Sequence, residues 1–390
     1  MPVLPPLRLT GARVLRDSVL QDIPLTFADG VISDDPAPEI NLSGYVVLPG
    51  IVDLHGDGFE RHLTPRPSAP FDKAHALRSV AAELSANGVT TAWMAQSWSW
   101  EGGFRSADAT EQLLDALDNA RPHLLPDMRV QIRLETHVPD DHPRLLQAVA
   151  HYGVDYVVFN NHLPEALEMV VSAPARFAQW AAQQGRNPDR LLTIVRQAAE
   201  RDSVVPAALG ILSKALAARN VSMGSHDDGD ATTRQRFSAF GAPICEFPTT
   251  VDAARAACDA NEPVLMGAPN VVRGGSQTGN IAAEDLIAEG LCDALVSDYY
   301  YPALAQAACA LAARGTLDFE HAWQMISTTP ASILGLSDRG RLDTGLRADL
   351  VIMNPETHMI EATIVEGCLA FAQGTVGSRL MGSTGHIAAQ

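Results

Sequence analysis

The sequence predicts an α/β protein in which a parallel (β/α)8 barrel carries a small β-sandwich domain built from both ends of the chain. Two observations lead to this fold class. The centre of the chain alternates short apolar strand candidates with Ala- and Leu-rich helix candidates, which is the pattern of a parallel barrel. Both ends are rich in short β-like runs separated by turns. The centre holds eight strand candidates, the number that closes such a barrel, and they are Gly50–His55, Thr90–Ala95, Val130–Glu135, Tyr156–Asn161, Val221–His226, Ile244–Phe247, Val264–Ala268 and Ala294–Asp298.

The two β-rich ends resemble each other. The opening segment, residues 7–47, contains turns such as Asp29-Gly30. The closing segment has a Gly340–Gly345 turn region before the apolar run Leu350–Met353. We therefore expect one composite β-rich domain from residues 1–48 and 338–390, and a barrel domain from residues 49–337.

The composition is that of a folded, acidic protein. Hydrophobic residues make up 46% and charged residues 19% of the 390 positions, which supplies a large core and argues against disorder. A net charge of -18 excludes a general nucleic-acid binder, although a few arginines can still make one pocket positive. The first residues lack a signal-peptide pattern, no apolar run has transmembrane length, and the five cysteines show no CxxC spacing. We expect a cytoplasmic protein with reduced thiols that binds neither nucleic acid nor a membrane.

Side chains of the metal-ligand type follow the strand candidates. His55 and Asp57 stand two positions apart at the end of the first strand, where both side chains point to the same side. Active sites of barrels lie at this carboxyl-terminal rim, so side chains that end different strands are expected to meet there. The residues predicted to ligate a metal are His55, Asp57, Glu135, His162 and His226.

These residues also have structural alternatives. The His-x-Asp pair could be a solvated strand end, Glu135 could form a salt bridge with Arg133, and His162 could lie in a turn. The carboxylates after the fifth strand, Asp227 and Asp228, are expected to cap a helix or to accept imidazole N–H groups.

The eighth strand ends in Asp298, which is the predicted catalytic residue. A carboxylate beside a metal-bound water can orient that water and accept its proton. The alternative is a structural aspartate that caps the next helix.

Two arginine-bearing segments predict binding of a phosphorylated small molecule. The Gly-rich loop Gly267–Ser276 after the seventh strand offers backbone N–H groups and the planar fork of an arginine. The segment Thr64–Pro67 presents a second arginine between two prolines. A lid loop whose arginine faces water is the alternative. The predicted phosphate-binding residues are Arg61, Arg66, Arg273, Gly274, Gly275 and Ser276.

The pattern Pro49-Gly50-x-x-Asp53-x-His55-x-Asp57 resembles the amidohydrolase superfamily, whose first barrel strand usually ends in His-x-His. The departure at Asp57, together with the segments Ser225–Asp228, Met266–Asn270 and Ser297–Tyr300, is similar to one branch, the diphosphatases of phosphonate metabolism. The likeness covers essentially the whole chain. It implies hydrolysis of the 5-triphosphate of α-D-ribose 1-methylphosphonate 5-triphosphate to the 5-phosphate and pyrophosphate, within the carbon–phosphorus lyase pathway.

The resemblance also implies one or two divalent metal ions, which would be zinc, manganese or magnesium. The sixth strand offers Glu246 but no histidine, so either His162 or Glu246 completes the metal site. The only lysines, Lys73 and Lys214, fall in helix candidates, and Glu135 therefore takes the place of the bridging lysine found in many members. Barrels of this superfamily often form dimers, so a homodimer is one of the expected states.

Two other function classes stay open. An amidase or deacetylase of the same superfamily would act on a C–N bond, and the scaffold alone cannot separate these bond types. A non-catalytic relative would bind nucleotides or serve as a scaffold. The arginine set favours a phosphorylated substrate over the first class. The presence of His55, Asp57, His226 and Asp298 counts against the second.

Overall fold

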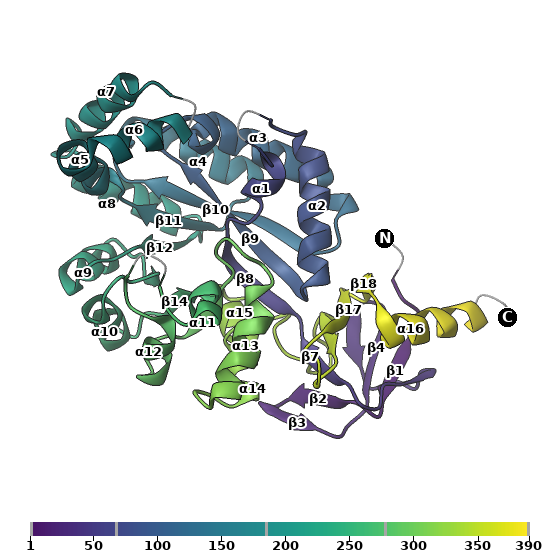
Figure 1. The fold of residues 1–390 in the computed structure, drawn as a ribbon. Helices are drawn as coiled ribbons and strands as arrows, with labels where there is room; N and C mark the ends of the chain where they lie inside the picture. Colours follow the sequence, from purple (N-terminus) through teal and green to yellow (C-terminus); the bar gives the residue numbers. More distant parts are fainter. Residues whose placement is uncertain (1–2, 67–68, 184–185, 277–278, 388–390) are drawn as a thin grey trace.

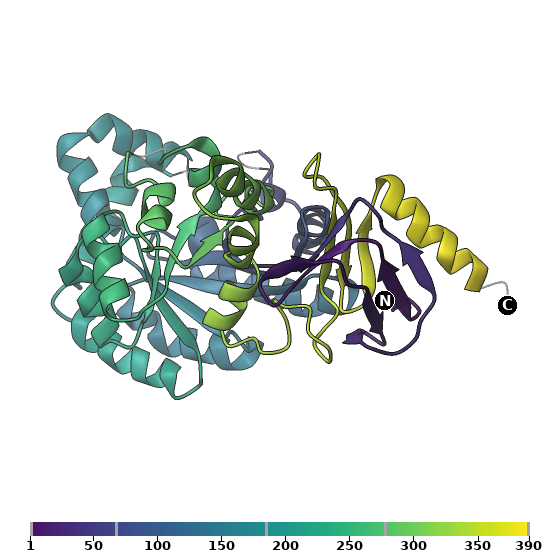
Figure 2. The same ribbon diagram turned by 90° about the horizontal axis from the view of Figure 1, so that it is seen from below.

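The computed structural model describes residues 3–66, 69–183, 186–276 and 279–387. It has two parts, a large barrel surrounded by helices and a smaller β-rich part beside it (Figures 1 and 2). The first strands of the chain and its last helix both lie in the smaller part (Figure 1). None of the helices in the described ranges combines the length and the apolar content needed to cross a bilayer.

The barrel is an eight-stranded parallel sheet in which every strand pairs with the next one along the chain. A parallel bridge between Gly56 and Asp298 brings the last strand back to the first and closes the barrel. All eight strand candidates are confirmed, although β9 and β10 are longer than predicted. The strands are β8 (Ile51–Gly56), β9 (Val89–Trp98), β10 (Asp127–Glu135), β11 (Tyr156–Asn160), β12 (Ser222–His226), β13 (Ile244–Glu246), β14 (Val264–Gly267) and β15 (Ala294–Val296).

Helices cover the outside of the barrel (Figures 1 and 2). Between β11 and β12 the chain makes a larger excursion of four helices, three of which share a small core of their own. The helices are α1 (Glu60–Leu63), α2 (Lys73–Ala86), α3 (Ala107–Ala120), α4 (His142–Tyr152), α5 (Leu163–Ser172), α6 (Pro174–Gln183), α7 (Pro188–Ala199), α8 (Val205–Ala217), α9 (Ala231–Ala239), α10 (Val251–Asp259), α11 (Ala268–Arg273), α12 (Ala283–Ala288), α13 (Ala303–Arg314), α14 (Phe319–Gln324) and α15 (Thr328–Ile333). Short 3-10 turns occupy Gly103–Arg105, Arg121–His123 and Pro139–Asp141.

The alternation of side chains in β10 explains how the barrel presents its polar groups. Ile132 and Leu134 pack outward in the core that the barrel shares with its helices. Gln131, Arg133 and Glu135 alternate with them and therefore project to the inner side. An apolar cluster below these groups fills the barrel interior, so the polar residues gather at the carboxyl-terminal rim.

The smaller part is a sandwich of two sheets built from both ends of the chain. The four-stranded sheet has the order β5-β4-β1-β6, and the six-stranded sheet has the order β18-β17-β16-β7-β2-β3. Antiparallel pairing of β7 with β16 joins the two ends, and residues of both sheets share one apolar core. The elements are β1 (Leu7–Thr10), β2 (Arg13–Arg16), β3 (Val19–Gln21), β4 (Leu25–Ala28), β5 (Val31–Ser33), β6 (Glu39–Asn41), β7 (Val46–Pro49), β16 (Leu350–Met353), β17 (Ile360–Val365), β18 (Cys368–Ala372) and α16 (Gly374–Ile387). The composite architecture is thus confirmed, while the boundaries at residues 48 and 338 stay a prediction.

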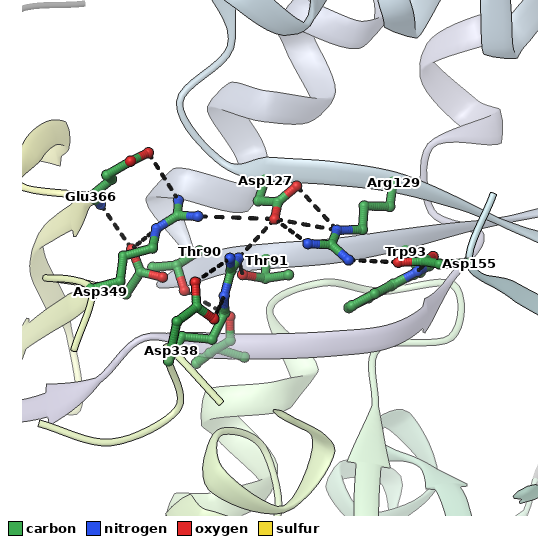
Figure 3. Close-up of polar contacts among 12 residues, drawn as sticks. Thr90, Thr91, Trp93, Asp127, Arg129, Asp155, Asp338, Asp349 and Glu366 are labelled. Atoms are coloured by element: carbon green, nitrogen blue, oxygen red, sulfur yellow. Dashed lines mark hydrogen bonds and ion pairs between the residues drawn. The ribbon is translucent and has the colours of Figure 1, made fainter. Parts of the chain in front are cut away.

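A network of ion pairs lies where the barrel strands begin, at the end away from the rim (Figure 3). Asp127, the first residue of β10, accepts hydrogen bonds from Arg129 at 2.8 Å and from Arg339 at 2.7 Å. Arg129 also donates to Asp155, just before β11, at 2.6 Å. Because Arg339 belongs to the segment that leads to β16, this network ties the barrel to the smaller part.

Candidate active site

Three side chains from three strands meet inside the rim of the barrel. His55 is the last residue but one of β8, His226 ends β12 and Glu246 ends β13. His55 Nδ1 lies 2.7 Å from Glu246 Oε2, and the two imidazole rings lie 5.2 Å apart between centroids. One ligand atom from each of the three residues lies within 4.8 Å of the others. We call these three residues the His55 group.

Buried hydrogen bonds fix the carboxylate of the His55 group. Glu246 Oε1 accepts hydrogen bonds from Tyr156 Oη at 2.6 Å and from Gln131 Nε2 at 2.7 Å. Burial alone would raise the pKa of Glu246, but the charge and hydrogen bond of His55 outweigh it and lower the pKa. An ionised carboxylate only accepts hydrogen bonds, so Nδ1 of His55 carries a proton and Nε2 is left as a ligand atom.

The His55 group fits a divalent metal ion. The imidazoles of His55 and His226 supply nitrogen ligands of the kind that zinc binds, and Glu246, whose two oxygens accept hydrogen bonds, orients the ring of His55. Burial lowers the pKa of His226, which keeps this imidazole in the neutral form that binds metals. His55 and Glu246 are almost fully buried, which limits competition by water.

A second group lies at the ends of β9 to β11 and consists of Glu101, Glu135 and His162, whose ligand atoms again fall within 4.8 Å of one another. Glu135 Oε1 lies 2.7 Å from His162 Nδ1, and Glu135 Oε2 accepts from Trp100 Nε1 at 3.2 Å. Burial opposes both charges, yet their mutual attraction lowers the pKa of Glu135 and raises that of His162. We call this the Glu135 group. Its two carboxylates suit a harder ion than zinc.

The structure therefore divides the five predicted metal ligands. His55 and His226 fall in one group and Glu135 and His162 in the other, while Asp57 belongs to neither group among the described residues. The suggested salt bridge between Glu135 and Arg133 does not form, since Glu135 is paired with His162.

Backbone contacts hold Asp57 and Asp298 at the seam that closes the barrel. The N–H of Asp57 donates to the carbonyl of Asp298 at 2.8 Å, and the N–H of Asp298 donates to the carbonyl of His55 at 3.0 Å. Gly56 between them has no room for a side chain, because a Cβ there would lie 2.7 Å from Ser297 Oγ. Asp298 has a φ of 55° and precedes α13 by several residues, so it does not cap that helix. Burial, with the nearby charge of Asp57, raises the pKa of Asp298 to about 6.

A cavity of about 240 Å³ opens beside these residues. Its volume lies just below the usual range for ligand pockets, which begins at about 300 Å³. Charged side chains of both signs face it. The lining residues are Asp57, Arg133, His226, Asp227, Phe247, Pro248, Met266, Gly267, Pro269, Asn270, Arg273, Gly275, Ser276, Asn280, Ile281, Asp298 and Tyr299.

The Gly-rich segment expected to be a loop is instead the short helix α11 followed by its capping turn. Arg273 is its last residue, and Gly274 ends the helix with a left-handed φ of 76°. The N–H groups of Gly274 and Gly275 donate to the carbonyls of Val271 and Asn270. The last carbonyls of a helix have no hydrogen-bond donor within the helix, and these two N–H groups donate to them. Phosphate binding by the two glycines stays a prediction. In the structure their N–H groups donate to backbone carbonyls instead.

The other predicted phosphate-binding residues are placed differently with respect to the cavity. Arg273, Gly275 and Ser276 line it, whereas Gly274 does not. Arg61 donates to the Tyr299 carbonyl at 2.9 Å, forms an ion pair with Glu83, and is not among the lining residues. Arg66 is exposed and also lies off the cavity, and Pro67 of the same segment lies outside the described residues.

Neither Asp227 nor Asp228 caps the following helix, whose cap is Asp230. Asp227 Oδ2 forms an ion pair with His226 Nδ1 at 2.8 Å, but the contact lacks the geometry of a hydrogen bond, so the acceptor role stays a prediction. Asp228 is buried, accepts from Ser225 Oγ at 2.6 Å, and pairs with Arg234.

Sequence reasoning missed several groups at this site. The sequence indicates Glu246 only as an alternative to His162, and it does not indicate that Gln131 and Tyr156 hold this carboxylate. Arg133 faces the cavity but was considered only as a salt-bridge partner. The alternation in β10 could have revealed Gln131 and Arg133, because it puts them on the face of Glu135. Tyr156 carries no such signal, since it begins an apolar strand.

Solved structures of low sequence identity share this fold. The N-acetylglucosamine-6-phosphate deacetylase from Pasteurella multocida matches with a TM-score of 0.60 and 9% identity, covering 93% of this chain and 99% of that chain. The N-acyl-D-glutamate deacylase from Bordetella bronchiseptica, complexed with zinc and a phosphonate inhibitor, matches with a TM-score of 0.60 and 13% identity, covering 95% and 97%. At these identities the match establishes the fold alone.

The model of the amidohydrolase family matches residues 189–371. The α-D-ribose 1-methylphosphonate 5-triphosphate diphosphatase of Escherichia coli (strain K12) is 31% identical over 326 residues, which cover 80% of this chain and 84% of that protein. The chain belongs to the amidohydrolase family and is a hydrolase related to that diphosphatase.

Proposed function

We propose that the protein is a metal-dependent diphosphatase that converts α-D-ribose 1-methylphosphonate 5-triphosphate to the 5-phosphate and pyrophosphate. The reaction consumes one water and breaks the phosphoanhydride bond between the α- and β-phosphates. The observation that carries the proposal is a small cavity in which Arg133 and Arg273 face the same space as His226 and Asp298. The name of the Escherichia coli relative supplies the substrate.

The residues that would hold metal ions are those of the two groups at the rim. We assign one ion to His55 and His226, with Glu246 orienting His55, and a second to Glu135 and His162 with Glu101. Asp57 remains a predicted ligand. A divalent ion at such a site supplies positive charge that polarises a phosphoryl oxygen and lowers the pKa of water.

Asp298 is assigned as the general base. Its carboxylate lines the cavity, and a pKa of about 6 leaves it mostly ionised at neutral pH yet close to the value that favours proton transfer. It would orient the attacking water and accept its proton. Arg273 would bind the phosphate oxygens, whose negative charge redistributes onto the departing pyrophosphate.

The test compares His226→Ala with the unchanged protein and with His75→Ala, which removes an exposed histidine on α2. Metal content and pyrophosphate release from ribose 5-triphosphates are measured on each. We expect His226→Ala to lose bound metal and pyrophosphate release, and His75→Ala to keep both. Retention of both by His226→Ala would reject the assignment.

The same preparations are assayed against N-acetyl and hydantoin substrates. Turnover of these, with none of the triphosphate, would favour the alternative in which the protein cleaves a C–N bond. A metal-loaded protein that is inert towards all of them would favour a non-catalytic role. A homodimer and a cytoplasmic location stay predictions.

A further inference from the structure

Arg133 occupies an unusual place for a charged side chain. It lies on the inner face of β10, between Gln131, which bonds Glu246, and Glu135, which bonds His162. Its side chain is 12% exposed, and it lines the cavity together with His226 and Asp298. The fold therefore places a largely buried positive charge between the two candidate metal groups.

One donor of the Arg133 guanidinium is not satisfied by the described part of the protein. Its Nε is buried and has no hydrogen-bond partner among the described residues. The nearest carboxylate oxygen in an ion pair with it, Oδ2 of Asp57, is 3.9 Å from Nη1, which is too far for a hydrogen bond. A guanidinium carries five donors, and leaving a buried one such as Nε unused costs free energy.

Other arginines near the rim are paired. Arg105 contacts Glu101 at 3.0 Å, and Arg61 pairs with Glu83 and donates to a backbone carbonyl. Glu135, two positions along β10, is already taken by His162. Of these three arginines, only Arg133 faces the cavity.

We propose that Arg133, which is less exposed than Arg273 in the lining of the same cavity, binds the phosphate chain of the substrate. This inference rests on the proposed function and names a residue that determines specificity for di- and triphosphate esters. A planar fork of donors matches two oxygens of one phosphate, which a lysine or an amide does not.

The local charge explains why a buried arginine is needed there. Asp57 and Asp298 face the same cavity and repel an anionic substrate. Arg133 puts positive charge beside them where water does not screen it fully. It would therefore decide whether a polyphosphate or a neutral amide is accepted.

The experiment compares Arg133→Gln and Arg133→Lys with the unchanged protein. Arg255→Gln is the matched control, because it removes an arginine that is 58% exposed and paired with Glu289 on the surface. All proteins are loaded with metal, and metal content is measured on each. Affinity for inorganic pyrophosphate is then measured by calorimetry, alongside kcat and KM for ribose 5-triphosphates.

We expect Arg133→Gln to keep its metal but to bind pyrophosphate roughly 10- to 100-fold more weakly, with a higher KM. Arg133→Lys should fall in between, because it keeps the charge but loses the fork. This variant also keeps the test valid if the glutamine variant does not fold. Arg255→Gln should match the unchanged protein.

Unchanged pyrophosphate affinity in both Arg133 variants would overturn the inference. The inference would also be overturned if the Arg133 variants lost metal and their pyrophosphate affinity fell only in proportion to that loss. Arg133 would then act as a counter-ion that positions the carboxylates. A different result would reject the proposed function but not the role of Arg133. The unchanged protein would bind pyrophosphate through Arg133 yet release none from ribose triphosphates.

Discussion

Replacing Asp127 with asparagine should destabilise the junction between the barrel and the smaller part. Asp127 is 17% exposed and is contacted by Arg129 and Arg339 (Figure 3). Asparagine keeps the size of the side chain but removes its charge, so the substitution isolates the ion pairs. Arg339, which is 7% exposed, keeps Asp338 as a partner in the variant.

The magnitude follows from the pKa of Asp127. Burial raises it, but the hydrogen bonds and charges of Arg129 and Arg339 outweigh burial and lower it from its ordinary 3.8 to about 2. At about 1.4 kcal/mol per pH unit, this corresponds to roughly 2.5 kcal/mol of stability at neutral pH. Because the folded pKa lies below the unfolded one, this stability is present above about pH 4 and is lost as the pH falls towards 2.

The assay is urea-induced unfolding of the unchanged protein and of Asp127→Asn at pH 7 and at pH 3. We expect a difference in unfolding free energy of about 2.5 kcal/mol at pH 7 and about half of that at pH 3. Taking the difference between the two proteins at each pH cancels the titration of the other acids. Asp343→Asn, which removes an exposed partner of Arg341, is the control and should cost about 0–1 kcal/mol at both pH values.

Two outcomes would refute this reasoning. A loss below about 0.5 kcal/mol at pH 7 would mean that the charge of Asp127 adds little beyond what an amide provides. An equal loss at pH 7 and pH 3 would mean that the effect comes from packing and hydrogen bonding, because a charge effect must shrink as the unfolded carboxyl becomes protonated.

Three further substitutions test the site and its support. Glu246→Gln should weaken metal binding about 10- to 100-fold, because the carboxylate fixes His55, and metal titration measures this. Asp298→Asn should retain metal but lower kcat by about 100- to 10,000-fold, the range for losing a general base, as steady-state kinetics would record. Arg234→Met should cost about 3–5 kcal/mol in urea unfolding, because it leaves the buried Asp228 without its partner.

Each of these expectations can fail in its own way. Full metal affinity in Glu246→Gln would separate Glu246 from the metal site. Normal kcat in Asp298→Asn would move the role of base to another group. A loss of unfolding free energy below about 1 kcal/mol in Arg234→Met would mean that protonation or a water molecule offsets the cost of leaving Asp228 buried without Arg234.

Much of the scaffold could be predicted from the sequence because it depends on local periodicity. The eight barrel strands and the β-rich ends follow from apolar patterning and turn residues. The ends of β8, β12 and β15 were correctly expected to carry His55, His226 and Asp298 to one rim. The segment after β14 was misread, because two adjacent glycines suggested a loop where Gly274 only ends a short helix.

The sequence by itself therefore determined the barrel, the composite sandwich and the set of strand-end side chains that share one rim. Only the tertiary structure decided which of these side chains meet. It pairs His55 with Glu246 and Glu135 with His162, and it leaves Arg133 facing the cavity with no hydrogen-bond acceptor for its Nε among the described residues. The physical reason is that alternation along one strand fixes the face of a side chain, whereas its partner depends on the register and spacing of strands far apart in the chain.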